Sequence, residues 1–600
     1  MQKKFSGHRK APRSPKAVNG IQVNFCKLPT CKNYGVPADT KRYPQGRPMR
    51  SEKRDKYRRC GDRSPRENTP YMQCLLCGAE FPLKSNLAIY EEFQRFSEHL
   101  KLIPPPLLSC PNPNCSNHLI GIDAKKKAYQ KCGKTKSGYQ RFKCKICGGT
   151  FSDTKVTKYQ KKPHKNKLVF KLLVNKSPIK RICEVADLHP KAVYGKIDFF
   201  YQRCLELVGR RERHFSDQQL DRVYVGVDSQ EYFVNWTNRK DKRNVKLTAV
   251  AAADNKTGYV FIANLNYDPN PDPISIEYLA KSCGDYELQK SFRQFARLWL
   301  QKDNDDNVKT SSGSASRSRH NSNSLVGQIK NTYEKALARD DIEVFEEVDA
   351  TDQLPNSGMK VHAEYTLYGS FYVLTKLFSK VKKVRFFLDQ DAGMRAACLG
   401  AFQKRISSRT GDAFYVSIKK NLTVEERRKR LKESHKELRQ MTKMYSNMSE
   451  MEIKLMLIKQ RLSEMRELGS WSDRWLRCPF PDMSEPEKAV CYLTDFGDYD
   501  IDHLAWLYNK ASLHATDRFF MQLRRKVSLL ERPFGSASNF QRIWHGYSPY
   551  NPFMITKMLT IFRTFYNYCL RGEKDKRTPA MRIGLAKSIV DIEDIIYGNA

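Results

Sequence analysis

Residues 223–228 have the sequence Val223-Tyr224-Val225-Gly226-Val227-Asp228, in which β-branched and aromatic side chains lead up to a carboxylate. Such a run is typical of a buried β-strand. A second strand-like run covers residues 245–253, a turn follows at 254–258, and a third strand-like run covers 259–264. Successive strands joined by short turns predict an antiparallel meander.

A later segment repeats the pattern of an apolar strand that ends in an acid. The run Lys383-Val384-Arg385-Phe386-Phe387-Leu388-Asp389 ends in a carboxylate, and residues 394–402 then have helical character. Aspartate is common at strand ends, so either aspartate alone is weak evidence of a site. Together, Asp228 and Asp389 predict a shared site in which carboxylates bind two divalent ions, Mg²⁺ or Mn²⁺. Asp391 is the alternative to Asp389, which is favoured because it directly follows the apolar run.

A third carboxylate is expected from a helix. Between residues 513 and 530, Phe520, Leu523 and Val527 form one apolar stripe, and Asp517 lies beside that stripe. Asp517 could therefore face the metal site. Glu531 is the alternative, but it lies just before a helix-ending proline and better fits the last turn of a helix.

Upstream of these strands, eight cysteines form the same pattern twice. A CxxxxC pair precedes a CxxC pair in each copy, with Cys26, Cys31, Cys74 and Cys77 in the first and Cys110, Cys115, Cys144 and Cys147 in the second. Two such pairs can present four thiolates to one structural Zn²⁺, so the pattern predicts two zinc ribbons. His99 and His118 are the plausible substitute ligands nearby. Cys60 and Cys132, which lie between the pairs, are expected to be packing residues.

Residues 177–194 predict a helix, a turn at 187–190 and a second helix. In a DNA-binding helix-turn-helix the second helix enters the major groove, which would place Lys191, Tyr194 and Lys196 near phosphates or base edges. A helical hairpin is common by itself. Here it follows two predicted ribbons and the basic segment 155–171, which favours the DNA-binding interpretation.

The charge balance points to the same partner. The chain has 107 lysines and arginines against 65 aspartates and glutamates, a formal charge of +42, and 45 of these basic but only 15 of these acidic residues lie within the first 210 positions. Such an excess favours a polyanionic partner, double-stranded DNA. The sequence contains no apolar run long enough to span a membrane and no apolar signal core after Met1, which predicts a soluble cytoplasmic protein.

These features together resemble the DDE/DDD transposases of bacterial insertion sequences in which a zinc-ribbon and helix-turn-helix head precedes an RNase H-like core. The resemblance covers nearly the whole chain. In that family the third acid is followed by Arg-Phe and then by Leu-Arg and a basic stretch, which Asp517-Arg518-Phe519 and Leu523-Arg524-Arg525-Lys526 match. The family residue is usually glutamate, whereas this chain has aspartate.

The resemblance implies metal-dependent cleavage at element ends and transfer of the freed 3′-hydroxyl into target DNA. It implies Arg524, Arg525 and Lys526 as DNA contacts, a homodimer or larger assembly on DNA, and a bacterial, nucleoid-associated location. His362 is a weaker candidate for a contact with the scissile phosphate. A non-catalytic DNA-binding regulator with a degenerate core and an RNase H-like nuclease remain as alternatives.

The sequence thus predicts a multidomain chain with a zinc-ribbon and all-α helix-turn-helix head and an α/β RNase H-like core with helical insertions. The expected divisions are a first zinc ribbon with a basic tail (1–100), a second zinc ribbon (101–160), a helix-turn-helix domain (161–215), the catalytic core (216–420 and 505–570) with a flexible loop (302–324), a helical insertion (421–504) and a C-terminal tail (571–600).

Overall fold

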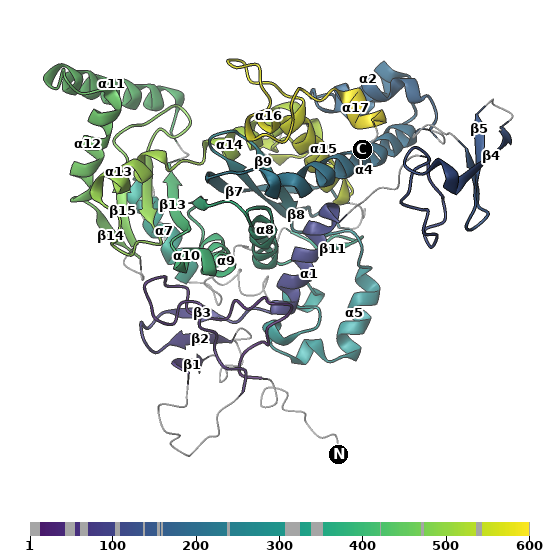
Figure 1. Cartoon of the computed structure of the whole chain (residues 1–600). Helices are drawn as coiled ribbons and strands as arrows, with labels where there is room; N and C mark the ends of the chain where they lie inside the picture. Colours follow the sequence, from purple (N-terminus) through teal and green to yellow (C-terminus); the bar gives the residue numbers. More distant parts are fainter. Residues whose placement is uncertain are drawn as a thin grey trace, which may run out of the picture. The chain divides into compact units, whose positions relative to one another are not determined.

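A computed structural model describes most of the 600-residue chain (Figure 1). The described residues are 12–41, 55–60, 70–101, 108–135, 139–152, 157, 160–236, 241–305, 324–337, 352–419, 422–469, 473–535 and 543–598. The predicted flexible loop at 302–324 lies mostly outside them.

The chain forms two compact units, each assembled from separate segments. The first unit contains residues 1–96, 219–520 and 549–553, and the second contains 97–218, 521–548 and 554–600. Both helices and sheets are present, so the chain is a multidomain α/β protein.

An eight-stranded sheet forms the centre of the first unit, in the order β14-β15-β16-β13-β12-β7-β8-β9. The predicted antiparallel meander is present as three consecutive strands, while β12 and β13 continue the sheet parallel to β7. The strands are β7 (Arg222–Val234), β8 (Val245–Asp254), β9 (Val260–Leu265), β12 (Lys383–Asp389), β13 (Gly411–Ile418), β14 (Arg466–Leu468), β15 (Asp473–Arg477) and β16 (Lys488–Tyr492).

Helices cover both faces of this sheet. Consecutive strand residues point to opposite faces, so the contacts of two neighbouring residues of β12 identify the helices on each face. Phe386 of β12 contacts Phe371 and Phe402, on the side of helices α8 (Ala363–Leu377), α9 (Ala392–Ala401) and α10 (Gln403–Ser407). Phe387 instead belongs to a buried cluster with side chains of α12 (Glu450–Leu462) and α13 (Ile501–Lys510). The sheet is therefore the middle layer of an α/β/α arrangement.

The segment 421–504 is not entirely helical, which corrects the prediction. Residues 424–462 form the expected helical pair, α11 (Val424–Met444) and α12, and each of these helices begins with a capping box. Residues 466–492 instead supply strands β14, β15 and β16, which extend the central sheet beyond β13. The short buried run at β16 pairs on both sides, with β13 and with β15, so this segment belongs to the core rather than to an insertion.

Smaller elements complete the first unit. They are a three-stranded sheet of β1 (Tyr57–Cys60), β2 (Tyr71–Cys74) and β3 (Glu80–Pro82), helices α1 (Asn86–Ser97), α5 (Pro273–Ser282) and α7 (Leu325–Leu337), and the pair β10 (Tyr267–Asp268) and β11 (Met359–Lys360). Helix α14 (His514–Lys526) begins in the first unit and ends in the second.

The second unit is a helical body with a small sheet. Its elements are the sheet of β4 (Tyr129–Lys134), β5 (Gln140–Cys144) and β6 (Thr150–Ser152), the pair β17 (Phe534–Gly535) and β18 (Ile543–Trp544), and the helices α2 (Asn166–Leu173), α3 (Ile179–Ala186), α4 (Pro190–Arg213), α15 (Phe553–Tyr568), α16 (Pro579–Ile583) and α17 (Ile592–Tyr597).

The predicted helix, turn and helix are present in this unit. Helix α3 ends at Asp187, whose left-handed backbone (φ 47°) reverses the chain, and α4 starts with Pro190 in its first turn. Ile182 and Val193 are fully buried between the two helices and their neighbours.

Residues 554–600 belong with these helices in the second unit, whereas the prediction assigned 554–570 to the core and 571–600 to a separate tail. Arg563 of α15 pairs with the buried Glu212 of α4, and Lys167 of α2 pairs with Glu593 of α17 at 3.1 Å. None of the helices in the described part of the chain combines the length and the apolarity needed to cross a membrane.

Candidate metal centres and nucleic-acid surfaces

Asp228 and Asp389 are side by side on neighbouring strands. Strands β7 and β12 run parallel with Val227 opposite Leu388, so the next residue on each strand is one of the two aspartates. Residues in register on parallel strands point to the same face, and these two share the face of Phe387, over which the α12–α13 layer lies. Asp228 is buried and Asp389 is half-buried. The sheet therefore pairs the two predicted carboxylates.

Helix α14, which contains Asp517, begins over strand β7. His514 contacts the backbone oxygen of Asn255, and the backbone N–H of Asn255 donates to the backbone oxygen of Tyr224. The Thr516 hydroxyl would lie 3.3 Å from a β-carbon on Gly226. The start of the helix thus lies over β7 at the level of Tyr224 and Gly226. Asp517 lies in its first turn, half-buried beside the buried stripe of Thr516, Phe520 and Leu523.

The alternative acids have structural roles. The Asp391 carboxylate caps α9 by accepting the backbone N–H of Met394 at 2.8 Å. Glu531 follows a short 3-10 turn (Ser528–Leu530) and pairs with Lys176 at 2.9 Å within the second unit. Both observations favour Asp389 and Asp517 as the candidate ligands.

Among the described residues, the groups of three or more potential ligands with atoms within 4.8 Å of one another are the two cysteine clusters. Asp228 and Asp389 are therefore adjacent on the sheet, but the three aspartates do not form such a compact group. Their binding of Mg²⁺ or Mn²⁺ stays a prediction.

Each cysteine cluster has the geometry of a four-sulfur metal site, and it consists of the four cysteines predicted from the spacing. In the first cluster Sγ of Cys26 lies 3.5 Å from Sγ of Cys77, and Sγ of Cys31 lies 3.8 Å from Sγ of Cys74. Sulfurs bound to one Zn²⁺ at about 2.3 Å are about 3.8 Å apart.

The second cluster repeats this arrangement. Its Cys110–Cys147 and Cys115–Cys144 sulfur pairs are 3.2 and 3.8 Å apart. Both clusters could therefore hold structural zinc, as in zinc ribbons. Neither histidine substitutes, because His99 pairs with Glu212 at 3.2 Å and His118 contacts the carbonyl oxygen of Cys110 through Nδ1.

The same polar residues support both clusters, and sequence analysis missed them. Asn33 and Asn117 each lie two positions after the second cysteine, and their amides donate to Sγ of Cys74 and Cys144. Tyr57 and Tyr129 each donate a hydroxyl hydrogen bond to the backbone oxygen of that asparagine. Cys-x-Asn and Tyr-x-x-Cys-Gly recur in both copies of the sequence, so this signal was present.

The surroundings of Cys144 favour its thiolate form. Burial raises the pKa of this thiol, but the N–H groups of Ile146 and Cys147 and the Asn117 amide together lower it to about 6. Thiolate is the form of cysteine that binds a metal ion.

The two cysteine modules have different surroundings. The first module, which consists of the first cluster and β1–β3, packs on the core of its own unit: the Tyr34 hydroxyl donates to the backbone oxygen of Leu399 at 2.8 Å. Gly35 lies against Gln403 so closely that a β-carbon would overlap its side chain. This module is therefore part of the body that carries Asp228.

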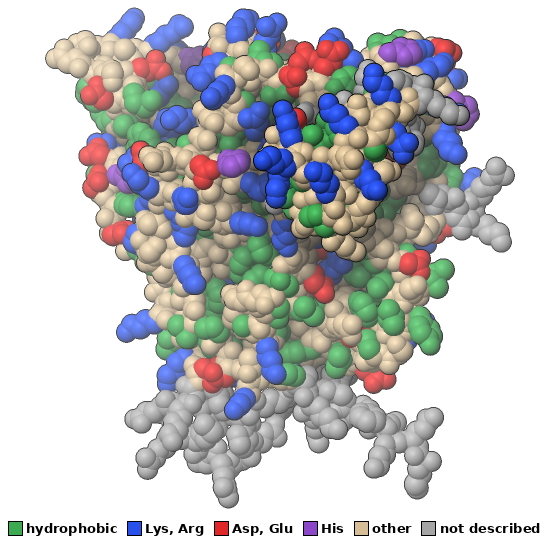
Figure 2. Space-filling model, turned by 45° about the vertical axis from the view of Figure 1, so that its right-hand side comes forward, with side chains coloured by type: hydrophobic (Ala, Val, Ile, Leu, Met, Phe, Trp, Pro, Cys, Tyr) green, Lys and Arg blue, Asp and Glu red, His purple; other side chains and the backbone are tan. Residues whose placement is uncertain are grey.

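The second module, which consists of the second cluster and β4–β6, has a strongly basic surface. Figure 2 shows lysines and arginines gathered on the part of the molecule that comes forward. In the described part of residues 108–152, Asp123 is the only acid, whereas the exposed basic residues are Lys125, Lys126, Lys127, Lys131, Lys134, Arg141, Lys143 and Lys145. Such a patch is suited to a polyanion.

The predicted DNA contacts of α4 divide into two kinds. Lys191 and Tyr194 are exposed near the start of the helix. Lys196 is not at the surface, which is a correction: it is 3% exposed, and its ammonium donates to the carbonyl oxygens of Lys161 and Lys162 and to the Asn166 side chain.

The basic residues at the end of α14 are differently exposed. Arg525 is exposed, while Arg524 and Lys526 are half-buried. The backbone oxygens of Arg524 and Lys526 accept hydrogen bonds from the side chain and the backbone of Lys176, which holds the helix end to the loop before α3.

His362 is a buried packing residue. Its ring stacks on Trp299 with the ring centres 4.2 Å apart, and burial together with nearby lysines and arginines lowers its pKa well below the usual value. This placement does not favour a contact with a scissile phosphate.

Comparison of the chain with protein-family models, with curated proteins and with solved structures gives no match.

Proposed function

We propose that this protein is a DNA transposase that cleaves strands at element ends and joins them to target DNA. The observation that carries the proposal is the placement of Asp228 and Asp389 at adjacent positions of parallel strands, while α14, whose first turn contains Asp517, packs over Gly226 of β7. A meander of three antiparallel strands extended by two parallel ones is also the sheet order expected of an RNase H-like core.

The three aspartates supply oxygen ligands, the type that Mg²⁺ and Mn²⁺ prefer. Two bound ions would activate a water or 3′-hydroxyl and stabilise the leaving oxygen. The protein's own part is positional: the sheet sets the spacing of Asp228 and Asp389, and the close packing of α14 on Gly226 sets the height of Asp517.

DNA recognition falls to the second unit in this proposal. Its exposed basic residues on the second module, together with Lys191 and Tyr194 at the start of α4, provide phosphate and groove contacts. The first module stabilises the core instead, because Tyr34 and Gly35 are occupied by contacts with it. Assembly on two DNA ends as a homodimer or larger is part of the proposal.

One assay tests the reaction. The purified protein is incubated with a labelled element end, target plasmid and Mg²⁺ or Mn²⁺. Joined product is the expected result, and nicks without joining would indicate an RNase H-like nuclease. Binding without cleavage, unchanged in Asp228→Ala, would indicate a DNA-binding regulator and refute the enzymatic proposal.

A further inference from the structure

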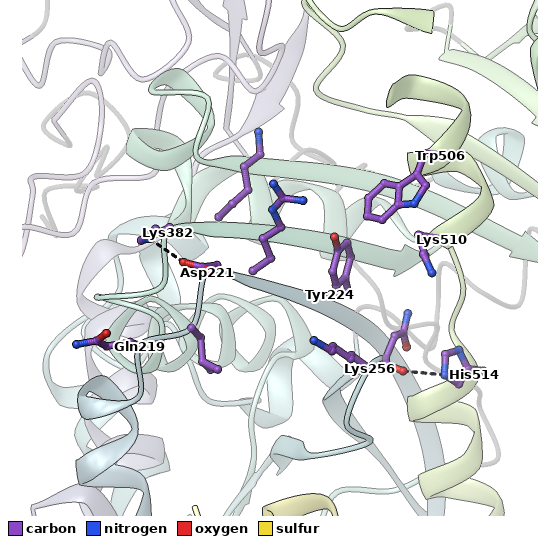
Figure 3. A pocket seen from close by; sticks show the side chains of 12 residues that line it. Gln219, Asp221, Tyr224, Lys256, Lys382, Trp506, Lys510 and His514 are labelled. Atoms are coloured by element: carbon purple, nitrogen blue, oxygen red, sulfur yellow. Dashed lines mark hydrogen bonds and ion pairs between the residues drawn. The ribbon is translucent and has the colours of Figure 1, made fainter. Parts of the chain in front are cut away.

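A large basic and aromatic cavity lies in the first unit at the end of the sheet opposite to the aspartates. Its volume is about 1150 Å³, and it is bordered by the first residues of β7 and β12 (Figure 3). Arg222 at its edge and Asp228 are six positions apart on β7, which corresponds to about 20 Å along a strand. The cavity is therefore separate from the candidate metal site.

The charges on the cavity wall are almost all positive. Arg222, Lys256 and Lys510 are exposed lining residues that form no salt bridge with a carboxylate in the described part of the chain, although Arg222 follows Asp221 directly. The ammonium of Lys510 lies 5.6 Å from the centre of the Trp506 ring. Asp221 is the single acid among the lining residues, and Lys382 neutralises it at 2.7 Å. In Figure 3 this pair lies apart from Tyr224, Lys256, Trp506 and Lys510. The remaining surface can attract an anion.

Two aromatic rings on the wall are held in place by a buried cation. The half-buried rings of Tyr224 and Trp506 meet edge to face with centres 5.9 Å apart. The guanidinium of Arg385, a residue that is 2% exposed, lies 5.6 Å and 5.8 Å from these two ring centres. It donates to the Tyr224 hydroxyl and to Asp412. The aromatic wall is thus fixed before any ligand binds.

Aromatic rings beside cations that are not in salt bridges are the combination that binds single-stranded nucleic acid, since bases stack on rings and phosphates meet lysines or arginines. Bases in a duplex have no free face for such contacts. The volume also exceeds the roughly 300–1,000 Å³ of ordinary small-ligand sites. We propose that this cavity binds a single-stranded DNA segment, with a base against Tyr224 and Trp506 and phosphates at Arg222, Lys256 and Lys510.

Photo-crosslinking of the full chain tests where a strand lies. The probe is a 15-nucleotide oligothymidylate that carries 5-iododeoxyuridine, and the matched control is the same oligonucleotide annealed to its complement. We expect the single strand to crosslink to peptides that contain Tyr224 or Trp506 and the duplex to do so much less. Single-strand crosslinks confined to other parts of the chain would overturn the proposal.

Affinity measurements with variants test the chemistry. Trp506→Ala should weaken binding of the single strand about five- to a hundredfold, and Trp506→Phe, which keeps a ring, should restore most of it. Lys256→Gln with Lys510→Gln should lower the salt dependence of single-strand binding by about 0.7 per lysine. The control is Lys404→Gln, because Lys404 is an exposed lysine of α10 on the other side of the sheet. This variant should change the affinity for the single strand and its salt dependence no more than the loss of one distant charge does.

An equal effect of Lys404→Gln and of the double lysine variant would refute the proposal. Displacement of the crosslink by a glutamate-rich peptide at lower concentration than by unlabelled oligothymidylate would also refute it, because an acidic peptide would then be the occupant. The inference does not depend on catalysis. Asp228→Ala should keep the crosslink even though it loses cleavage, so the two proposals can fail separately.

Discussion

The Thr516 hydroxyl of α14 lies directly over Gly226 of β7, where a β-carbon on the glycine would come within 3.3 Å of it and within 3.2 Å of the Asn255 side chain. Gly226 precedes Asp228 by two positions and shares its face of the sheet. The missing side chain therefore lets the helix that carries Asp517 approach the strand that carries Asp228.

Gly226→Val should separate these two elements. The added side chain must displace Thr516 and Asn255, and such overpacking costs about 1–3 kcal/mol of unfolding free energy. We expect a lower melting temperature and a loss of Mg²⁺-dependent cleavage, with two zinc ions still bound. Gly195→Ala is the control, because a β-carbon on Gly195 of α4 meets nothing within 4 Å. Full cleavage by Gly226→Val would show that this approach does not position Asp517.

Asp389 and Asp391 should differ sharply when each is replaced by asparagine. Asp389→Asn removes a charge next to Asp228 that the proposal assigns to metal binding, so cleavage should fall at least a hundredfold while DNA affinity stays. Asp391→Asn should keep most of the activity, because asparagine is as good a helix cap as aspartate and can still accept the N–H of Met394. Cleavage rates at saturating Mg²⁺ measure both. The reverse order of effects would assign the metal ligand to Asp391.

The two cysteine modules should respond differently to loss of zinc. Cys74→Ser and Cys144→Ser should each lower the zinc content from two ions to one. Cys74→Ser should also lower the melting temperature of the first unit, since the first module contacts the core through Tyr34. Cys144→Ser should spare that transition and weaken DNA binding, since it unfolds the basic surface of β4 and β5. Equal thermal effects would contradict the different placements of the modules.

Features set by local spacing could be predicted from the sequence. The eight cysteines form two clusters because each CxxC or CxxxxC pair fixes its own loop, and the apolar runs before Asp228 and Asp389 both form strands. Strand β12 ends at Asp389 as expected, but the prediction of a strand end at Asp228 is wrong, because β7 continues to Val234. Once the runs are paired in parallel, their register places both acids together. The asparagines and tyrosines that support the cysteines also recur in the sequence, so only their role required the structure.

Features set by distant partners could not be predicted. Strands β14 and β15 are too short to be recognised from their own residues. They belong to the sheet because β14 pairs with β15, β15 pairs with β16, and β16 pairs with β13. The grouping of α15 with α4 depends on the contact of Arg563 with Glu212, which are 351 positions apart in the chain. No spacing rule connects such residues, because the packed structure alone brings them together.

Lys191 and Lys196 are on one helix and were both predicted to contact DNA, yet their substitutions should have opposite consequences. Lys191 is exposed, so Lys191→Ala should leave the melting temperature unchanged and reduce the salt slope of DNA binding by about 1. Lys196→Ala removes hydrogen bonds to two backbone oxygens and leaves the buried side-chain oxygen of Asn166 without this donor, which should cost about 1–3 kcal/mol of unfolding free energy. Lys196→Met keeps the apolar length of the side chain and separates lost packing from lost hydrogen bonds. Thermal unfolding and salt-dependent anisotropy distinguish the two lysines. A reduced salt slope with unchanged stability in Lys196→Ala would place that ammonium on DNA and contradict its buried position.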